Sequence, residues 1–173
     1  SDYFGHAVSI DGDYAIVGAY RDDDNGSSSG SAYIFKRDGT SWSQQRKVTA
    51  PDGAASDFFG WSVSIDGDDA IVGAYGDDVY STSNGGSAYI FARSGTSWNI
   101  QDKLILHLYE ARDSDRFGYS VSIDGDYALV GAPGHNAEPV PAKRISDSNV
   151  ANSPVYGPAS GAAVLFRRGM STP

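Results

Sequence analysis

Cysteine is absent from this chain of 173 residues, and histidine and methionine are scarce, with three copies and one copy. The absence of cysteine excludes disulfides, thiolate metal sites and a cysteine nucleophile. Positive charge is also in short supply, since 22 acidic residues against 13 Lys and Arg give a formal net charge of −9. Nucleic acid binds through Lys and Arg that neutralise phosphates, so it is an unfavourable partner, as is an anionic membrane surface.

Long apolar stretches and helical periodicity are missing as well. No run approaches the roughly 18 apolar residues that span a bilayer, which predicts no membrane insertion. No segment repeats its apolar residues at the 3.6-residue period of a helix. The chain also lacks a Gly-x-Ser-x-Gly elbow, a phosphate-binding loop and a His-rich metal motif. The sequence therefore predicts very little helix and a protein that is not an enzyme.

The dominant feature that is present is an internal repeat. A block of the form Phe-Gly-x-(Ala/Ser)-Val-Ser-Ile-Asp-Gly-Asp begins at Phe4, at Phe59 and at Phe117. Each block continues into Ala-(Ile/Leu)-Val-Gly-Ala, a polar loop and an apolar segment that ends in Phe. Repeats of this length are typical of solenoids, propellers and arrays. Three units are expected, at about residues 1–55, 56–112 and 113–173.

Each unit is expected to form four short antiparallel strands. In the first strand, Phe4, His6, Val8 and Ile10 alternate with other residues and share one face. Asp11-Gly12 and its two equivalents are hairpin signals. The second and third strands are apolar on both faces, and such strands must be covered on both faces. The pattern predicts an all-β fold of β-propeller blades, in three four-stranded antiparallel units.

The third unit is expected to be incomplete. Units one and two close with a strand that carries Trp42 or Trp98, whereas unit three stops at Arg167-Arg168, which leaves eleven strands. Propellers have about four to eight blades, so residues 1–173 predict a single partial β-propeller within a larger ring or assembly. Two versions stay open, a piece of a longer propeller and copies that associate edge to edge.

The recurring motifs resemble those of a known family. Phe59-Gly60 and Gly131-Ala132-Pro133, with Gly18-Ala19-Tyr20 and Gly73-Ala74-Tyr75 as near variants, resemble the FG-GAP repeat of integrin α-chains in its bacterial-type form. The resemblance implies a β-propeller with an adhesive or ligand-binding role in an extracellular or cell-surface setting. The family's calcium motif is missing from its usual place, because Ser9 to Asp13 form only a tight turn there.

Acidic residues nevertheless cluster in the loops that follow the second strand of the first two units. Hard cations prefer several oxygen ligands in a flexible loop, so these loops are candidate Ca²⁺ sites. The alternative is a solvated turn whose carboxylates bond their own backbone. The candidate metal ligands are Asp22, Asp24, Asp77 and Asp78.

Aromatic residues near the same loops are candidate ligand contacts. Sugars stack on exposed rings, which makes Tyr20, Tyr75 and Tyr80 candidates, with ring packing inside the blade as the alternative. Asn25 belongs to the same loop and begins the glycosylation sequon Asn25-Gly26-Ser27. Tyr156 lies in the long segment 134–160 of unit three, a length that favours either recognition or coverage of a blade edge.

Three functions follow from this reading. The first is an extracellular, non-catalytic module for adhesion or for binding a protein or glycan ligand. The second is a structural protomer that self-associates through its blade edges into a ring or filament. The third is an accessory domain of a secreted carbohydrate-active enzyme.

Overall fold

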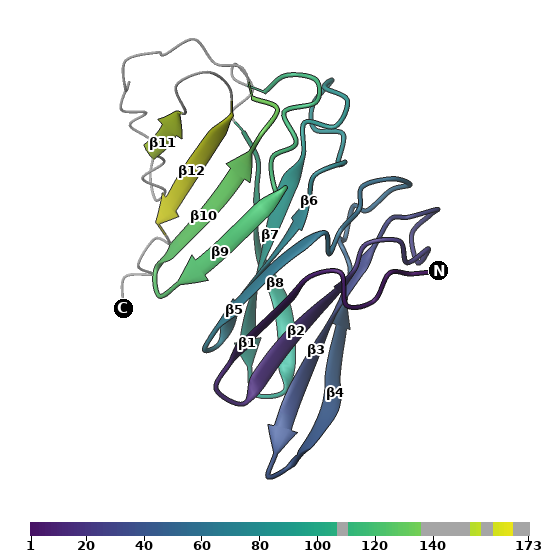
Figure 1. The fold of residues 1–173 in the computed structure, drawn as a ribbon, viewed down its shortest axis with the longest axis vertical. Coiled ribbons are helices and arrows are strands. Elements are labelled where there is room, and N and C mark those ends of the chain that lie inside the picture. The colour runs from purple at the N-terminus through teal and green to yellow at the C-terminus, as the bar shows by residue number, and fades with distance from the viewer. Residues whose placement is uncertain (107–110, 136–152, 157–160, 168–173) are drawn as a thin grey trace.

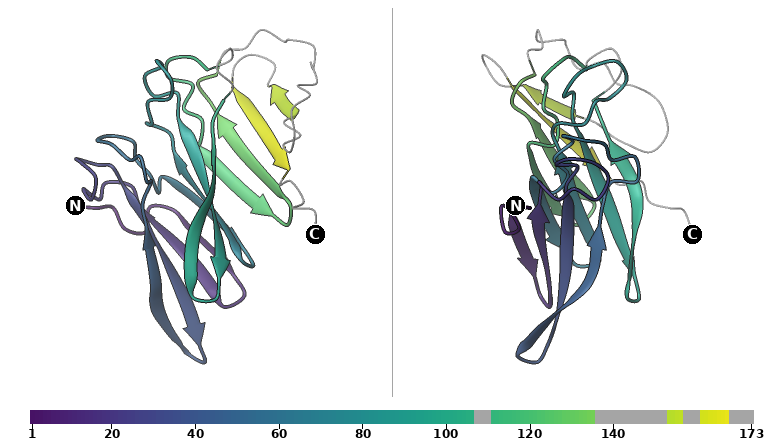
Figure 2. Two further views of the ribbon diagram at one scale, coloured as in Figure 1. Left: turned by 180° about the vertical axis from the view of Figure 1, so that it is seen from behind. Right: turned by 90° about the vertical axis from the view of Figure 1, so that its right-hand side faces the viewer.

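The structure is an assembly of β-sheets. The computed structural model describes residues 1–106, 111–135 and 161–167, together with the backbone of residues 153–156. Every regular element in these parts of the chain is a β-strand, so none of them holds a helix that could cross a membrane. The strands form three four-stranded antiparallel sheets, and the second sheet lies between the first and the third (Figures 1 and 2). The predicted all-β fold of propeller blades is confirmed.

The first two blades share one topology. In each, the four strands are neighbours in chain order, β1-β2-β3-β4 and β5-β6-β7-β8. The strands of these blades are β1 (Val8–Asp11), β2 (Tyr14–Ala19), β3 (Ser31–Asp38), β4 (Ser41–Val48), β5 (Ser62–Asp66), β6 (Asp69–Ala74), β7 (Ser87–Ser94) and β8 (Ser97–Leu104).

Local backbone geometry corrects two details of the first strand. Asp11 pairs with Tyr14, so the two hairpin residues are Gly12 and Asp13, one position later than expected. Gly12 has a φ of 51°, which glycine adopts readily. Strand β1 starts only at Val8, because a φ of 91° at Gly5 interrupts the extended backbone before it.

The third blade reaches four strands by a different route. Its spatial order is β9-β10-β12-β11, so β11 precedes β12 in the chain but lies outside it, at the edge that β4 and β8 occupy in the other blades. The expected total of eleven strands is therefore wrong. Pro154 lies in β11, and proline is tolerated in an edge strand because one side of that strand has no partner. These strands are β9 (Ser120–Asp124), β10 (Tyr127–Ala132), β11 (Ser153–Tyr156) and β12 (Ala162–Arg167).

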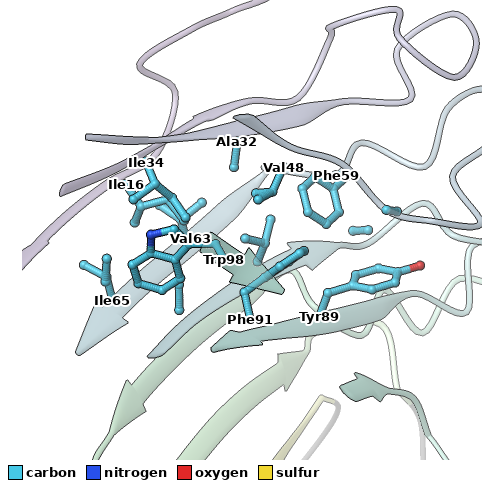
Figure 3. Close-up of a cluster of buried hydrophobic side chains, with 14 residues drawn as sticks. Ile16, Ala32, Ile34, Val48, Phe59, Val63, Ile65, Tyr89, Phe91 and Trp98 are labelled. Atoms are coloured by element: carbon cyan, nitrogen blue, oxygen red, sulfur yellow. The ribbon is translucent and has the colours of Figure 1, made fainter. Parts of the chain in front are cut away.

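The hydrophobic core lies between the blades. Ile16 and Ile34 of the first blade pack toward Val63, Phe91 and Phe59 of the second, and all five are at most 8% exposed (Figure 3). A second cluster joins the second and third blades in the same way. The prediction that the apolar strands are covered on both faces is thus confirmed for the middle blade.

The first strands of the three blades are linked by a repeated pair of hydrogen bonds. Ile65 N–H donates to Ser9 Oγ at 3.2 Å, and Gly67 N–H donates to the Asp11 carboxylate at 2.9 Å. The same two bonds, at 3.2 and 2.7 Å, join β9 to Ser64 and Asp66 of β5. Asp11 is therefore an inter-blade acceptor as well as a turn residue.

The Phe-Gly motif of each blade presses against the Gly-Ala motif of the blade before it. A Cβ atom on Gly18 would lie 1.9 Å from the carbonyl oxygen of Gly60, and one on Gly73 would lie 2.0 Å from that of Gly118. No side chain fits at such a distance, so the close approach of two backbones requires glycine at both positions.

Adding one methyl group at this contact is expected to destabilise the fold. Gly18→Ala and Gly73→Ala should each lower the free energy of unfolding by about 1–3 kcal/mol, the usual cost of overpacking. The measurement is urea denaturation in dilute solution. Gly131→Ala is the matched control, because the nearest atom to a Cβ there is Ser120 Oγ, which can rotate away. Equal losses in all three variants would contradict the backbone contact as the cause.

Candidate functional site

The loops that follow β2 and β6 form a rim at one end of the blades (Figure 1). We call residues 20–30 and 75–86 the rim loops. Each rim loop is bonded to the next blade through main-chain groups, because Phe58 N–H donates to Ser28 O at 3.2 Å and Phe59 N–H donates to Ser29 O at 3.0 Å. The second rim loop repeats these bonds with the third blade, at 3.1 and 3.0 Å. The rim is therefore fixed by the stacking of the blades.

A row of aromatic rings crosses the rim. The rings of His6, Tyr20, Trp61, Tyr75 and Tyr119 follow one another with centroid separations of 4.6, 4.8, 4.7 and 5.4 Å. The members come alternately from the position after a Phe-Gly motif and the position after a Gly-Ala motif, so all three blades contribute. We call these five residues the aromatic row.

The aromatic row is partly open to solvent. His6 and Tyr119 are exposed, Trp61 and Tyr75 are half-buried, and Tyr20 is buried. Burial raises the pKa of Tyr75, so its hydroxyl group stays protonated at neutral pH and can donate a hydrogen bond. The row thus offers ring surfaces together with polar edges.

The structure separates the predicted ligand contacts into two groups. Tyr20 and Tyr75 lie in one row, joined through Trp61. Tyr80 is 54% exposed and is not a member of the aromatic row, and the Asn25 side chain donates to Ala50 O at 3.2 Å. Tyr156 lies in β11, whose side chains are outside the described part of the chain.

Three members of the aromatic row, His6, Trp61 and Tyr119, are not among the ligand contacts predicted from the sequence. Their shared repeat position, directly after Phe-Gly, is the signal that could have placed them beside Tyr20 and Tyr75. Trp98 does pack, at 3% exposure, whereas Trp42 is 43% exposed.

The predicted metal ligand Asp22 is the centre of a hydrogen-bonded cluster. Its Oδ2 accepts from Ser31 Oγ at 2.8 Å and from Tyr33 OH at 2.9 Å, and it pairs with Lys47 Nζ at 2.9 Å. Lys47 also pairs with Asp24. Burial alone would raise the pKa of Asp22, but the hydrogen bonds from Lys47, Ser31 and Tyr33 outweigh it and lower that pKa.

The second blade repeats this cluster residue for residue. Asp77 Oδ2 accepts from Ser87 Oγ at 2.5 Å and from Tyr89 OH at 3.1 Å, and it pairs with Lys103 Nζ at 2.7 Å. Asp52 joins as a further partner of Lys103, at 2.6 Å. Although burial opposes it, hydrogen bonding to Asp52 and Asp77 raises the pKa of Lys103, which keeps the ammonium charged. We call the two sites the Asp-Lys clusters.

The Asp-Lys clusters bear on the calcium prediction. One carboxylate oxygen of Asp22 and one of Asp77, the Oδ2 atom in each case, is already bonded to an ammonium group and two hydroxyl groups. Asp78, the remaining candidate, accepts a hydrogen bond from Asn84 N–H at 2.8 Å. Among the residues that the structure describes, no three His, Cys, Asp or Glu side chains are grouped to hold a metal ion. Calcium binding stays a prediction, and a Ca²⁺ ion would compete with the ammonium groups of Lys47 and Lys103 for the aspartates.

Comparison with protein families agrees with the geometry. The FG-GAP repeat model matches residues 1–35, 42–91 and 98–143. The chain belongs to the FG-GAP repeat family. A search of curated proteins found no match. The close approach of Gly60 to Gly18 gives the family's motif a physical meaning, because Phe-Gly of one blade sits against Gly-Ala of the previous one.

The third FG-GAP unit replaces the Asp-Lys cluster with a different pair. His135 occupies the repeat position of Asp22 and Asp77, since its N–H donates to Ala132 O and its carbonyl accepts from Gly161 N–H, as the two aspartates do with their equivalents. Its Nδ1 lies 3.0 Å from Asp115 Oδ1, and both side chains are at most 2% exposed.

The partners of the aspartate change together with it. Ala162 and Val164 stand where the other FG-GAP units have the serine and the tyrosine that donate to the aspartate. The cluster is thus kept or lost as a unit. An alignment of the three units on their Gly-Ala motifs places His135 at the position of Asp22 and Asp77.

Asp57, at the second blade's equivalent of Asp115, is expected to make stability depend on pH. It is 5% exposed and accepts a hydrogen bond from Ala54 N–H at 2.6 Å. Burial, reinforced by the nearby Asp77 carboxylate, raises its pKa to about 6. This pKa exceeds the value of about 3.9 in the unfolded chain, so the folded state favours the protonated carboxyl group of Asp57. The resulting contribution to the free energy of unfolding is complete below pH 4 and is lost as the pH rises through 6.

Asp57→Asn should therefore raise the melting temperature at pH 7.5 and give little change at pH 4, because the amide is neutral and its oxygen still accepts from Ala54. Thermal denaturation at several pH values measures this. Asp113→Asn, an exposed carboxylate of the next unit, is the control. A melting difference that is the same at both pH values would contradict the raised pKa.

Proposed function

We propose that this FG-GAP chain is a non-catalytic binding module that holds a glycan across the aromatic row and the rim loops, in an extracellular or cell-surface setting. The observation that carries the proposal is the continuity of the aromatic row over three blades. Five rings follow one another within 5.4 Å, and their spacing is fixed by main-chain bonds between the blades. A preformed surface loses little entropy when a ligand binds.

The chemistry of the row suits a sugar chain. Sugar rings present C–H groups that stack on aromatic faces and hydroxyl groups that bond to polar edges. Tyr119, at the open end of the row, is 38% exposed, and Tyr3 flanks Tyr20 at 5.3 Å. The guanidinium of Arg21 lies 4.9 Å from the centre of the Tyr3 ring and adds donors beside the row. A protein ligand that inserts an apolar side chain is the other outcome of a binding experiment.

The Asp-Lys clusters support the proposal that the module is not catalytic. Lys47 and Lys103 could act as bases or nucleophiles only in their neutral form. Hydrogen bonds to the neighbouring aspartates raise the pKa of both lysines against the effect of burial. Both clusters therefore favour a structural role.

Removing an exposed ring of the row should weaken glycan binding without unfolding the blades. Tyr119→Ser should lower glycan affinity by about 10-fold or more, because one ring stacked on a ligand contributes on the order of 1–2 kcal/mol. Ile100→Ser is the matched control, since Ile100 in β8 is similarly exposed, at 43% against 38% for Tyr119, but lies outside both the aromatic row and the rim loops. A glycan array followed by titration calorimetry makes the measurement. An intact fold that binds nothing, or equal loss in both variants, would contradict the proposal.

The calcium prediction has its own test. A Ca²⁺ ion at Asp22 and Asp24 must displace the ammonium group of Lys47, which pairs with both. Lys47→Met should therefore increase the rise in melting temperature that CaCl₂ produces, and EDTA should reverse it. If CaCl₂ changes the melting temperature of neither the wild type nor the variant, the calcium prediction is wrong.

A further inference from the structure

Two arginines lie beside the aromatic row without an acidic partner. Arg21 directly follows Tyr20 in the first rim loop, and Arg116 lies three residues before Tyr119. Both side chains are exposed, and neither forms an ion pair with an acidic residue in the part of the chain that the structure describes. The lysines of the Asp-Lys clusters, in contrast, are paired with aspartates. The two arginines are therefore available to pair with a ligand.

The guanidinium group of Arg21 is held against two rings. Its Cζ atom lies 4.9 Å from the centre of the Tyr3 ring and 5.7 Å from the centre of the Tyr20 ring. A guanidinium group that packs on an aromatic face keeps its N–H donors in its own plane, where they can form two parallel hydrogen bonds with a carboxylate or a sulfate. The rings thus position Arg21 and leave its donors available beside the row.

Arg116 takes the place of an aromatic residue. The same repeat position holds Tyr3 in the first unit and Phe58 in the second, and all three residues have a φ between 53° and 56°. Phe58 stacks on Tyr75 with ring centroids 5.2 Å apart. Arg116 and Phe58 also donate their main-chain N–H in the same way, each to a carbonyl of the preceding rim loop. The third unit therefore exchanges a ring beside the row for a cation.

Both arginines act on the middle of the aromatic row. Burial is the largest influence on the pKa of Tyr75 and raises it, whereas the positive charges of Arg116 and Arg21 lower it. Both charges are thus close enough to the same hydroxyl group to affect it. Arg21 belongs to the first blade and Arg116 to the third, so the row between them crosses both blade junctions inside the chain. A ligand that lies along the row meets both cations.

The acidic residues near the row are held by the main chain. Asp23 accepts a hydrogen bond from Ser28 N–H at 2.7 Å, and Asp113 accepts one from Ser83 N–H at 2.8 Å. These bonds fix the carboxylates and leave the arginines as charged groups of the rim that have no partner. The net charge of −9 repels a ligand with a dense run of negative charge, so the two arginines suit a ligand with few, spaced anionic groups.

We propose that the ligand of the aromatic row is an anionic glycan, whose sugar rings stack on the row and whose carboxylate or sulfate groups pair with Arg21 and Arg116. This inference rests on the proposed glycan-binding function and adds the charge of the ligand to it. Hydrogen bonds between a guanidinium group and an anion are stronger than those between neutral groups. A single-stranded nucleic acid also combines rings with anions, but it carries a charge on every nucleotide and needs more cations than two arginines.

Matched oligosaccharides test the charge of the ligand. On a glycan array with uronate-containing, sulfated and neutral members, binding should be confined to the anionic members. Titration calorimetry then compares a bound uronate oligosaccharide with its methyl ester, or a bound sulfated one with its desulfated form. The neutral form should bind about 10-fold more weakly or worse, because it loses the charge-assisted hydrogen bonds. A single-stranded oligonucleotide of similar total charge should not bind.

Substitution of the arginines locates the anion site. Arg21→Gln and Arg116→Gln should each weaken binding of the anionic oligosaccharide by about 10-fold and leave binding of its neutral form unchanged. The lysine variants keep the charge but lose the paired donors, so they should recover only part of the affinity. Lys36→Gln is the matched control, because it removes one exposed positive charge at the end of the first blade away from the rim, where Lys36 pairs with Tyr14 at the start of β2. Melting temperatures should match the wild type, since both arginines are exposed.

The outcomes separate this inference from the proposed function. If neutral glycans bind as tightly as anionic ones, with a loss in Tyr119→Ser and none in the arginine variants, the charge of the ligand is wrong and glycan binding stands. If an anionic glycan binds through the arginines and is insensitive to Tyr119→Ser, the anion site stands and the role of the row is wrong. A folded chain that binds no glycan, or that prefers the oligonucleotide, contradicts both. An equal loss in Lys36→Gln would overturn the arginines as the anion site, because overall charge alone would explain it.

Discussion

The seating of each Phe-Gly motif on the Gly-Ala motif of the preceding blade is the contact on which the other features depend. Phe59 and Phe117 are fully buried there, and each is followed by a glycine whose carbonyl lies against the backbone of the previous blade. Because two main chains touch, the distance between blades is set by van der Waals contact of backbone atoms and not by adaptable side chains. The apolar clusters then fill the space that this contact defines.

The rim inherits its geometry from the same contact. The residues directly after Phe-Gly and directly after Gly-Ala are the ones whose rings form the aromatic row. Trp61 meets both Tyr20 and Tyr75 because the motifs beside them touch. The two Asp-Lys clusters fasten β4 and β8 to the rim loops and leave the aromatic row as the apolar part of that end. Binding of a ligand to the aromatic row therefore depends on the stacking of the blades.

Much of the fold could be predicted from the sequence, because a strand that is apolar on both faces has few ways to avoid water and the repeat shows that this happens three times. The features that the sequence did not predict depend on contacts between residues that lie far apart in the chain. Strand β11 carries no alternation of its own and is defined by its partner β12, and Lys47 reaches Asp22 from the far end of β4. The acidic loops were interpreted as cation sites because their counter-ions lie some 25 residues away in the sequence. The His135–Asp115 pair needed the repeat to be aligned on backbone positions and not on residue type.

Amide hydrogen exchange in dilute solution tests the central contact most directly. The N–H groups of Phe58, Phe59, Arg116 and Phe117 are bonded only to carbonyls of the preceding blade's rim loop. If blade stacking holds the rim, these amides exchange as slowly as those inside the central strand β6, since they open only when the blades separate. Exchange as fast as that of the exposed hairpin residues Thr40 and Thr96 would contradict the account.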